Sequence, residues 1–254
     1  MRKATIIYNP LAGSSNLLPV LKAVVAQWQA AGWQLELKQT THVGHATTLA
    51  KAAVSAGCDL VFAAGGDGTL GEVVNGLVHT ECVLAPLPIG TANAFAAELH
   101  LPLPNRWRPR HLLAASKALL YGSVQRIDVG RLTYGDEAEN GRYWVLWAGL
   151  GAVATNVQRV EPRPIWSKRL GKAGYFIQGI PHLQAVRPFQ LALTVDGRQS
   201  NHSVIQLLAS NVRIYAGAAM HLTTQTKLDD GKLDIWLLQT ISPLMLVYLG
   251  LKTM

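Results

Sequence analysis

The feature that most constrains the fold is an apolar run that ends in a glycine-rich turn. Residues Leu60–Ala64 are all apolar, and they are followed by the turn Gly65–Thr69, which reads GGDGT, and by a helix-like pattern over Leu70–Val78. A short apolar run bounded by turn residues is typical of a strand that is buried on both faces. The sequence therefore predicts a buried strand, a tight turn and a helix in direct succession.

Strand-like and helix-like segments alternate along the first half of the chain. Strands are also expected at Lys3–Tyr8, Trp33–Thr40 and Val83–Leu87, and helices at Leu17–Ala31, His45–Ala56 and His111–Tyr121. Because such alternation puts helices on both faces of a parallel sheet, we predict a Rossmann-like α/β domain over residues 1–123.

The pattern changes at Gly122-Ser123, after which the chain is mostly strand-like. Strands are expected at Val124–Leu132, Tyr143–Ala148, Phe189–Val195, Val204–Ser210 and Leu233–Leu238. One helical insertion is expected at Pro164–Val186, and turns at Asp196-Gly197 and Asp230-Gly231. We therefore predict a mainly antiparallel, β-rich second domain over residues 124–254.

Composition indicates a folded protein of the cytosol. Apolar residues make up 49% of the chain and charged residues 15%, which excludes a disordered chain. The two cysteines, Cys58 and Cys82, lack the CxxC spacing of zinc and redox sites, so we expect free thiols in a reducing compartment. The N-terminal segment is unlike a signal peptide, and the longest apolar stretches fall short of the roughly 20 residues that cross a bilayer. We expect a cytoplasmic protein, peripheral at the inner membrane surface.

The formal net charge of +8 favours acidic partners, which are nucleotides, anionic lipid headgroups or nucleic acid. The lysines and arginines are scattered along the sequence. A nucleic-acid-binding protein would instead concentrate them in a stripe with interleaved aromatic residues, or in a recognisable module. We therefore expect no nucleic-acid partner.

The turn Gly65–Thr69 has the composition of a phosphate-binding turn. Glycines let the backbone approach a ligand closely, and a helix N-terminus presents free N–H groups and a positive dipole to an anion. Asp67 would repel phosphate unless a divalent cation lies between them or the carboxylate accepts a proton from an attacking hydroxyl. The alternative is a structural turn in which Asp67 or Thr69 caps the helix that follows.

Two further polar turns follow other strands of the expected sheet. Asn9–Ser15 comes after the first strand and Pro88–Asn93 comes after the fourth. Because the carboxyl ends of all strands in an open parallel sheet lie on one edge, we expect the three turns to converge on one ligand site. The chain lacks the GxxxxGK[ST] and GxGxxG motifs, so the P-loop and dinucleotide-fold interpretations lose their main support.

Taken together, these motifs resemble those of the diacylglycerol kinase catalytic-domain family, which includes bacterial lipid kinases and sphingosine kinases. The matching segments are Asn9-Pro10 with Gly13, Thr40 before Gly44, Gly65–Gly76, Pro88–Asn93, Ser210-Asn211 and Leu228–Asp234. The GGDGT turn also occurs in NAD kinases and phosphofructokinases, but its combination with PxGTxN and DDGxLD is specific. The resemblance implies a nucleotide-binding α/β domain and a β-sandwich-like domain, with ATP and the lipid in the cleft between them.

The resemblance also implies which residues bind ATP and a metal ion. The ATP site would consist of Asn9, Pro10, Gly13, Thr40, Gly65, Gly66, Asp67, Gly68, Thr69, Glu72, Thr91 and Asn93. A Mg²⁺ site in the second domain would use the carboxylate of Asp230 and the backbone carbonyls of Lys227 and Lys232. Asp230-Gly231 also has the sequence of an ordinary hairpin turn, so a structural role for it stays open.

The sequence departs from the family pattern at several positions. Gly71 and Ala94 stand where the family commonly has Asn and Asp, and Gly149–Ala154 lacks the acidic residue that follows the family's glycines. Family members also continue through a further strand-rich stretch that carries a DGE motif. We therefore expect the second domain to be incomplete at Met254.

The expected function is phosphoryl transfer from ATP to the hydroxyl of diacylglycerol or a related lipid. Magnesium would bridge the phosphates, and Asp67 would be the catalytic residue near the attacking hydroxyl. A nucleotide-binding regulatory pseudokinase and an NAD kinase-like enzyme are the alternatives, and a homodimer is left open.

Overall fold

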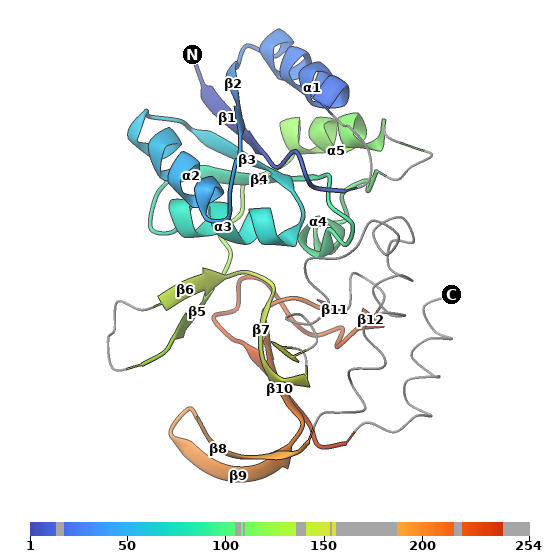
Figure 1. Ribbon diagram of the computed structural model, residues 1–254. Helices are drawn as coiled ribbons and strands as arrows, with labels where there is room; N and C mark the ends of the chain where they lie inside the picture. Colours follow the sequence, from blue (N-terminus) through green and yellow to red (C-terminus); the bar gives the residue numbers. More distant parts are fainter. Residues whose placement is uncertain are drawn as a thin grey trace.

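The first half of the chain forms a parallel sheet of four strands in the order β2-β1-β3-β4 (Figure 1). Its strands are β1 (Lys3–Tyr8), β2 (Gln34–Gln39), β3 (Leu60–Gly65) and β4 (Val83–Pro88), and its helices are α1 (Leu18–Ala30), α2 (His45–Ser55), α3 (Asp67–Leu77), α4 (Ala94–Glu98) and α5 (His111–Leu120). The computed structural model describes residues 1–13, 18–104, 108, 110–135, 141–152, 154–155, 187–215 and 220–240.

Helices cover both faces of this sheet. β3 is buried along its whole length because it lies between β1 and β4. Figure 1 shows α2 and α3 on one side of the sheet and α1 and α5 on the other. Since successive side chains of a strand point to opposite faces, Val61 packs in an apolar cluster with α2 and α3, whereas Phe62 packs in a second cluster with α1 and α5. The predicted Rossmann-like arrangement is therefore confirmed.

The second half of the chain forms small antiparallel sheets. β7 (Trp147–Gly151), β10 (Gln206–Ser210) and β13 (Asp234–Leu238) make one sheet in the order β13-β10-β7. The other pairs are β5 (Gly130–Thr133) with β6 (Gly141–Trp144), β8 (Phe189–Val195) with β9 (Arg198–Val204), and β11 (Ile214–Tyr215) with β12 (Met220–His221). Every strand pairing among the described residues of this half is antiparallel, as predicted.

Two predicted strands are wrong in extent. Only the end of Val124–Leu132 is a strand, which begins at Gly130. Before it, the Asp128 N–H donates to the Leu228 carbonyl over 2.6 Å and so is not part of a strand ladder. The predicted strand Tyr143–Ala148 is in fact two strands, β6 and β7, which belong to different sheets.

The sequence predicts neither α4 nor β9. α4 has only five residues, too few to show helical periodicity. β9 is polar and mostly exposed, so it shows no apolar alternation. A third difference is that α3 begins at Asp67 and not at Leu70, so the last residues of the glycine turn are helical. The predicted helix at 164–186 lies outside the described residues.

The two predicted turns of the second half have different outcomes. Asp196 and Gly197 join β8 to β9 with φ angles of 49° and 78°, as a two-residue hairpin turn requires. Asp230-Gly231 does not make a hairpin, because β13 pairs with β10 and not with a strand just before the turn. The Asp128 carboxylate holds that turn instead, accepting a hydrogen bond from the Gly231 N–H over 2.7 Å.

The two halves contact each other through α3 and α4. The side chain of Asn75, on α3, exchanges two hydrogen bonds with the backbone N–H and carbonyl of Tyr143, over 2.9 and 2.8 Å. At the end of α4 the buried carboxylate of Glu98 accepts hydrogen bonds from the Arg213 N–H and Nε and from the Ile214 N–H, over 3.1, 2.6 and 3.1 Å. α3 and α4, which follow the turns after β3 and β4, are thus fixed against the β-rich half.

Candidate functional site

The turn Gly65–Thr69 is tight because strand and helix follow each other almost directly. β3 ends at Gly65 and α3 begins at Asp67, with Gly66 as the N-cap between them. A Cβ on Gly65 would collide with the side chain of Thr69, which is itself buried. The packing of the turn therefore requires glycine at position 65.

The three polar turns converge at the carboxyl edge of the sheet. The N–H groups of Ile89 and Gly90 both donate to the Gly65 carbonyl over 3.1 Å. A Cβ on Gly90 would collide with Gly66, and a Cβ on Gly13, where φ is +71°, would collide with the Ile89 carbonyl. The glycines of each turn thus let the backbone of its neighbour approach closely, as expected from the topology.

Gly68 differs from these glycines because no packing contact requires it. It is exposed, its φ is not positive, and a Cβ there would meet no atom within 4 Å in the described part of the chain. Glycine in a helix is less stable than alanine by about 0.5–1 kcal/mol. Since the first N–H groups of a helix have no intrahelical partner, the bare backbone at Gly68 leaves them open to an anion.

The asparagines of the predicted site shape its turns. Asn93, at a φ of 51°, accepts from the Gly90 N–H and donates to the Gly90 carbonyl, both over 2.9 Å. Oδ1 of Asn9 accepts from the N–H two residues later over 2.9 Å. Thr40 is buried beside β1, where its N–H donates to the last carbonyl of that strand over 2.9 Å. Pro10, in the turn after β1, and Thr91, in the turn after β4, are the other residues of these turns that are predicted to bind ATP.

Glu72 makes its contacts with a different helix. Its Oε2 accepts from the Ala46 N–H at the start of α2 over 3.1 Å, and its carbonyl accepts from the Thr47 hydroxyl over 2.8 Å. Gly44 is the N-cap of α2 and provides no side-chain cap, so Glu72 satisfies a free N–H group there. Contact between Glu72 and ATP stays a prediction.

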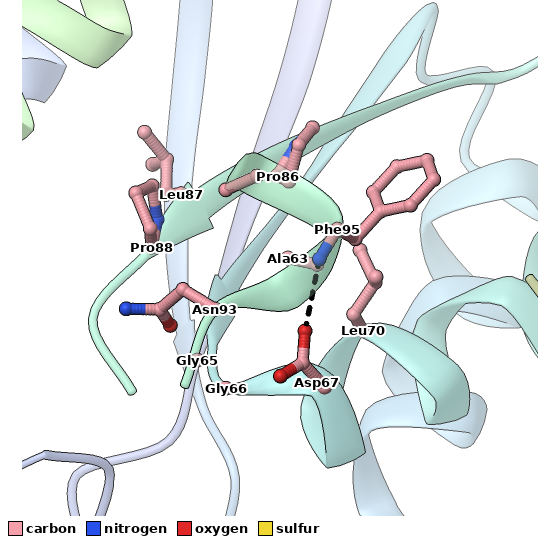
Figure 2. A pocket seen from close by; sticks show the side chains of 11 residues that line it. Ala63, Gly65, Gly66, Asp67, Leu70, Pro86, Leu87, Pro88, Asn93 and Phe95 are labelled. Carbon is pink, nitrogen blue, oxygen red and sulfur yellow. Dashed lines mark hydrogen bonds between the residues drawn. The ribbon is translucent and has the colours of Figure 1, made fainter. Parts of the chain in front are cut away.

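Asp67 links the glycine turn to α4. Its Oδ2 accepts from the Ala94 N–H over 3.1 Å, and its Oδ1 accepts from the Phe95 N–H over 3.2 Å. Figure 2 shows the second of these hydrogen bonds. Asp67 thus caps α4. The N-cap of α3 is Gly66, so the alternative that Asp67 or Thr69 is the N-cap of α3 is wrong.

Burial raises the pKa of Asp67 above its usual range, although the two α4 N–H groups act in the opposite direction. A small pocket adjoins the carboxyl, and its apolar walls include Leu70, Pro86 and Phe95 (Figure 2). Asp67 and Asn93 are the polar side chains among the residues that line it. The apolar walls explain why the charged form of Asp67 is disfavoured, so this carboxyl holds a proton more readily than an exposed aspartate does.

The predicted metal residues lie in the turn before β13. Oδ1 of Asp230 accepts from the Lys232 N–H over 3.1 Å, and the neighbouring Asp229 accepts from Nε2 of Gln125 over 2.8 Å. Within the described residues, no group of three or more His, Cys, Asp or Glu side chains could hold a metal ion. A site made of Asp230 and the carbonyls of Lys227 and Lys232 has one such side chain, so it stays a prediction.

One residue that the sequence does not point to lies beside α3. Nη2 of Arg142, on β6, is 3.9 Å from the position that a Cβ on Gly71 would occupy. The contact depends on how β6 packs across α3, so no local pattern could predict it. Its nearest signal in the sequence is Gly71 itself, which departs from the family pattern.

A parallel sheet with three glycine-bearing turns at its carboxyl edge, followed by antiparallel sheets, defines an α/β protein with a β-rich second part. Two family models match the chain, the diacylglycerol kinase catalytic domain over residues 3–132 and the YegS C-terminal NAD kinase beta sandwich-like domain over residues 146–252. The chain belongs to the diacylglycerol kinase catalytic-domain family.

Individual relatives agree with this membership. The chain is 31% identical over 241 residues to a diacylglycerol kinase of Bacillus subtilis (strain 168), covering 94% of this chain and 74% of the relative. It is 30% identical over 232 residues to a diacylglycerol kinase of Staphylococcus saprophyticus, covering 91% and 70%. A crystal structure of a candidate diacylglycerol kinase from Bacillus anthracis str. Sterne is similar with a TM-score of 0.72 and 26% identity, covering 99% of this chain and 80% of that one.

The predicted family and the predicted two-part fold are therefore confirmed. The family is one of lipid kinases that use ATP. Among the described residues, no helix combines the length and apolar character needed to cross a bilayer.

Proposed function

We propose that this protein is an ATP-dependent lipid kinase that phosphorylates the hydroxyl of diacylglycerol or a related lipid. Family membership supports the reaction class, and the relatives named diacylglycerol kinase support the acceptor. The nucleotide part of the proposal rests on Gly68, because no packing contact explains why a glycine stands at this position near the start of α3. A ligand that approaches the N–H groups closely would explain it.

In this proposal the phosphates of ATP bind at the N-terminus of α3. The N–H groups of Gly66, Gly68 and Thr69 would donate to phosphate oxygens, helped by the positive end of the helix dipole. Gly13 and Gly90 would hold the neighbouring turns close enough to enclose the phosphates. Asn9, Thr40 and the other predicted ATP residues on these turns would complete the site.

Asp67 is proposed to accept the proton of the attacking hydroxyl. As the hydroxyl oxygen bonds to phosphorus, its proton passes to the carboxylate and the bond from the phosphorus to ADP breaks. The raised pKa of Asp67 suits this role, because a base works best when its pKa approaches the working pH. Bound Mg²⁺ would neutralise charge on the phosphates, and a second cation at Asp230 would stabilise the β-rich half.

The binding test uses Gly68→Val, with Ala118→Val as the control, because Ala118 is an exposed position of α5. A Cβ at position 68 meets nothing, and the side chain of Ala118 is exposed, so both variants should fold. ATP with Mg²⁺ should raise the Tm of the wild type and of Ala118→Val, because a ligand of the folded state stabilises it. Gly68→Val should lose this rise. A rise that persists in a folded Gly68→Val contradicts the phosphate site.

The catalytic test measures phosphate transfer from ATP to diacylglycerol in mixed vesicles by the full-length protein. Asp67→Asn should lower the rate by orders of magnitude while weakening ATP binding much less, since the proton acceptor acts mainly in the transition state. Activity that survives in Asp67→Asn would remove Asp67 from the mechanism. ATP binding without transfer to any lipid would favour the regulatory pseudokinase.

A further inference from the structure

Arg142 is an exposed cation beside the first two turns of α3. Its side chain makes no hydrogen bond or ion pair with the residues that the structure describes, and its Nη2 is 3.9 Å from the Cβ position of Gly71. A solvated arginine on a surface is ordinary. Any further role for Arg142 must therefore be inferred from its position relative to α3.

The backbone next to Arg142 is anchored on α3. Tyr143 exchanges two backbone hydrogen bonds with the side chain of Asn75, over 2.9 and 2.8 Å. The Tyr143 hydroxyl also lies 2.9 Å from Nε2 of His79, just beyond the end of the helix. β6 therefore cannot slide along α3 without breaking these contacts, and the base of the Arg142 side chain has a fixed place.

The helix face under Arg142 leads to the phosphate turn. Gly68, Gly71 and Asn75 are spaced by three and four residues, so they share one face of α3, with about 5–6 Å between successive positions. Two of the three have no side chain. The surface between the guanidinium and the start of the helix is thus left open by Gly71 and Gly68.

The nearest carboxylates of α3 are already engaged. Asp67 accepts hydrogen bonds from the N–H groups of Ala94 and Phe95, and Glu72 accepts from the Ala46 N–H. The charge of Arg142 is therefore not neutralised by either of them and remains available for an anion.

We propose that Arg142 binds the outer phosphates of the nucleotide, so that the β-rich half contributes a residue to the phosphate site. This inference rests on the proposed function. A guanidinium offers parallel N–H donors that match two phosphate oxygens. A phosphorylated lipid headgroup has the same oxygens, but the open face of α3 runs from Arg142 to Gly68, where the nucleotide phosphates would bind.

The test is calorimetric titration of ATP, ADP and AMP, each with Mg²⁺, into four proteins. These are the wild type, Arg142→Ala, Arg142→Lys and the control Arg198→Ala, which removes the same charge from the exposed β9 strand. Arg142→Ala should weaken ATP binding on the order of tenfold or more, because hydrogen bonds to charged groups contribute this much. AMP should bind nearly unchanged, and Lys should restore part of the affinity. Arg198→Ala should match the wild type.

Several results would overturn the inference. One is an equal loss of ATP and AMP affinity in Arg142→Ala, which would indicate a structural role. Another is an unchanged ATP affinity combined with weaker binding of phosphatidic acid vesicles, which would assign the arginine to the lipid. If the wild type binds ATP and Arg142→Ala binds it equally well, only this inference fails. If the wild type binds no ATP, the proposed function fails with it.

Discussion

At the scale of single residues, Asp67 is subject to two opposing influences. The N–H groups of Ala94 and Phe95 favour its carboxylate form, whereas burial against the apolar pocket disfavours the charge. Burial dominates, and the pKa is raised. The carboxyl that is proposed to take a proton in the reaction therefore has a higher affinity for protons than the carboxyl of an exposed aspartate.

This raised pKa predicts a pH-dependent stability. Because the folded state binds more protons than the unfolded chain, the favourable contribution of Asp67 to the free energy of unfolding is complete below its ordinary pKa of about 3.9. It is lost as the pH rises through the folded-state pKa. The wild type should therefore lose stability relative to Asp67→Asn as the pH increases from about 4 towards neutrality. Urea unfolding of both proteins at several pH values measures the difference, and the opposite slope would contradict a raised pKa.

Local sequence predicts the glycine turns but not their long-range partners. Glycines next to a buried strand carry their own signal, because few other residues fit a turn in which Gly65 touches Thr69. The bonds from Asp67 to the start of α4 and the approach of Arg142 to Gly71 join residues far apart in the chain. Such contacts follow from how elements pack, which no local pattern records.

At the scale of elements, α4 depends on its two ends. A helix of one turn is not stable by itself, because nucleation is unfavourable. Asp67 satisfies two N–H groups at its start, and Glu98 at its end accepts three hydrogen bonds from the β-rich half. α4 is therefore held by tertiary contacts on both sides.

Glu98→Ala should lower the free energy of unfolding by about 3 kcal/mol, because it leaves a cation and two backbone N–H groups without their acceptor. Arg213 is about one-third exposed, at 34%, so water compensates part of its loss. Glu81→Ala is the matched control. Glu81 pairs with Arg126, but both side chains are exposed, and such pairs contribute little. Urea unfolding measures both, and equal effects would contradict a structural role for Glu98.

The elements of the parallel half were easier to predict than those of the β-rich half, for a physical reason. β3 is buried on both faces and therefore appears as an unbroken apolar run. β9 is held mainly by its backbone pairing with β8, and its side chains are polar and mostly exposed. Val145 and Leu146 follow β6 and precede β7 in the sequence, and both are buried. The apolar run in the sequence therefore continues where one sheet ends and the next begins, and it does not reveal the break.

At the scale of the whole molecule, the net charge of +8 should govern encounter with lipid surfaces. We expect the protein to sediment with vesicles that contain an anionic lipid and much less with neutral vesicles. Added salt should abolish the difference, because the screening length falls from about 10 Å at 0.1 M to about 3 Å at 1 M. Binding that is equal on both kinds of vesicle, or insensitive to salt, would exclude electrostatic attraction as the cause.

The hydrogen bonds from α4 to Asp67 also provide a way to observe the ionisation of this carboxyl. The amide protons of Ala94 and Phe95 point at the carboxyl oxygens, so their chemical shifts will follow its ionisation. Isotope labelling of these two residues would let an NMR titration observe the carboxyl directly, without a substitution at Asp67. The same two signals would register a cation or a phosphate that arrives beside it, and would do so before any turnover takes place.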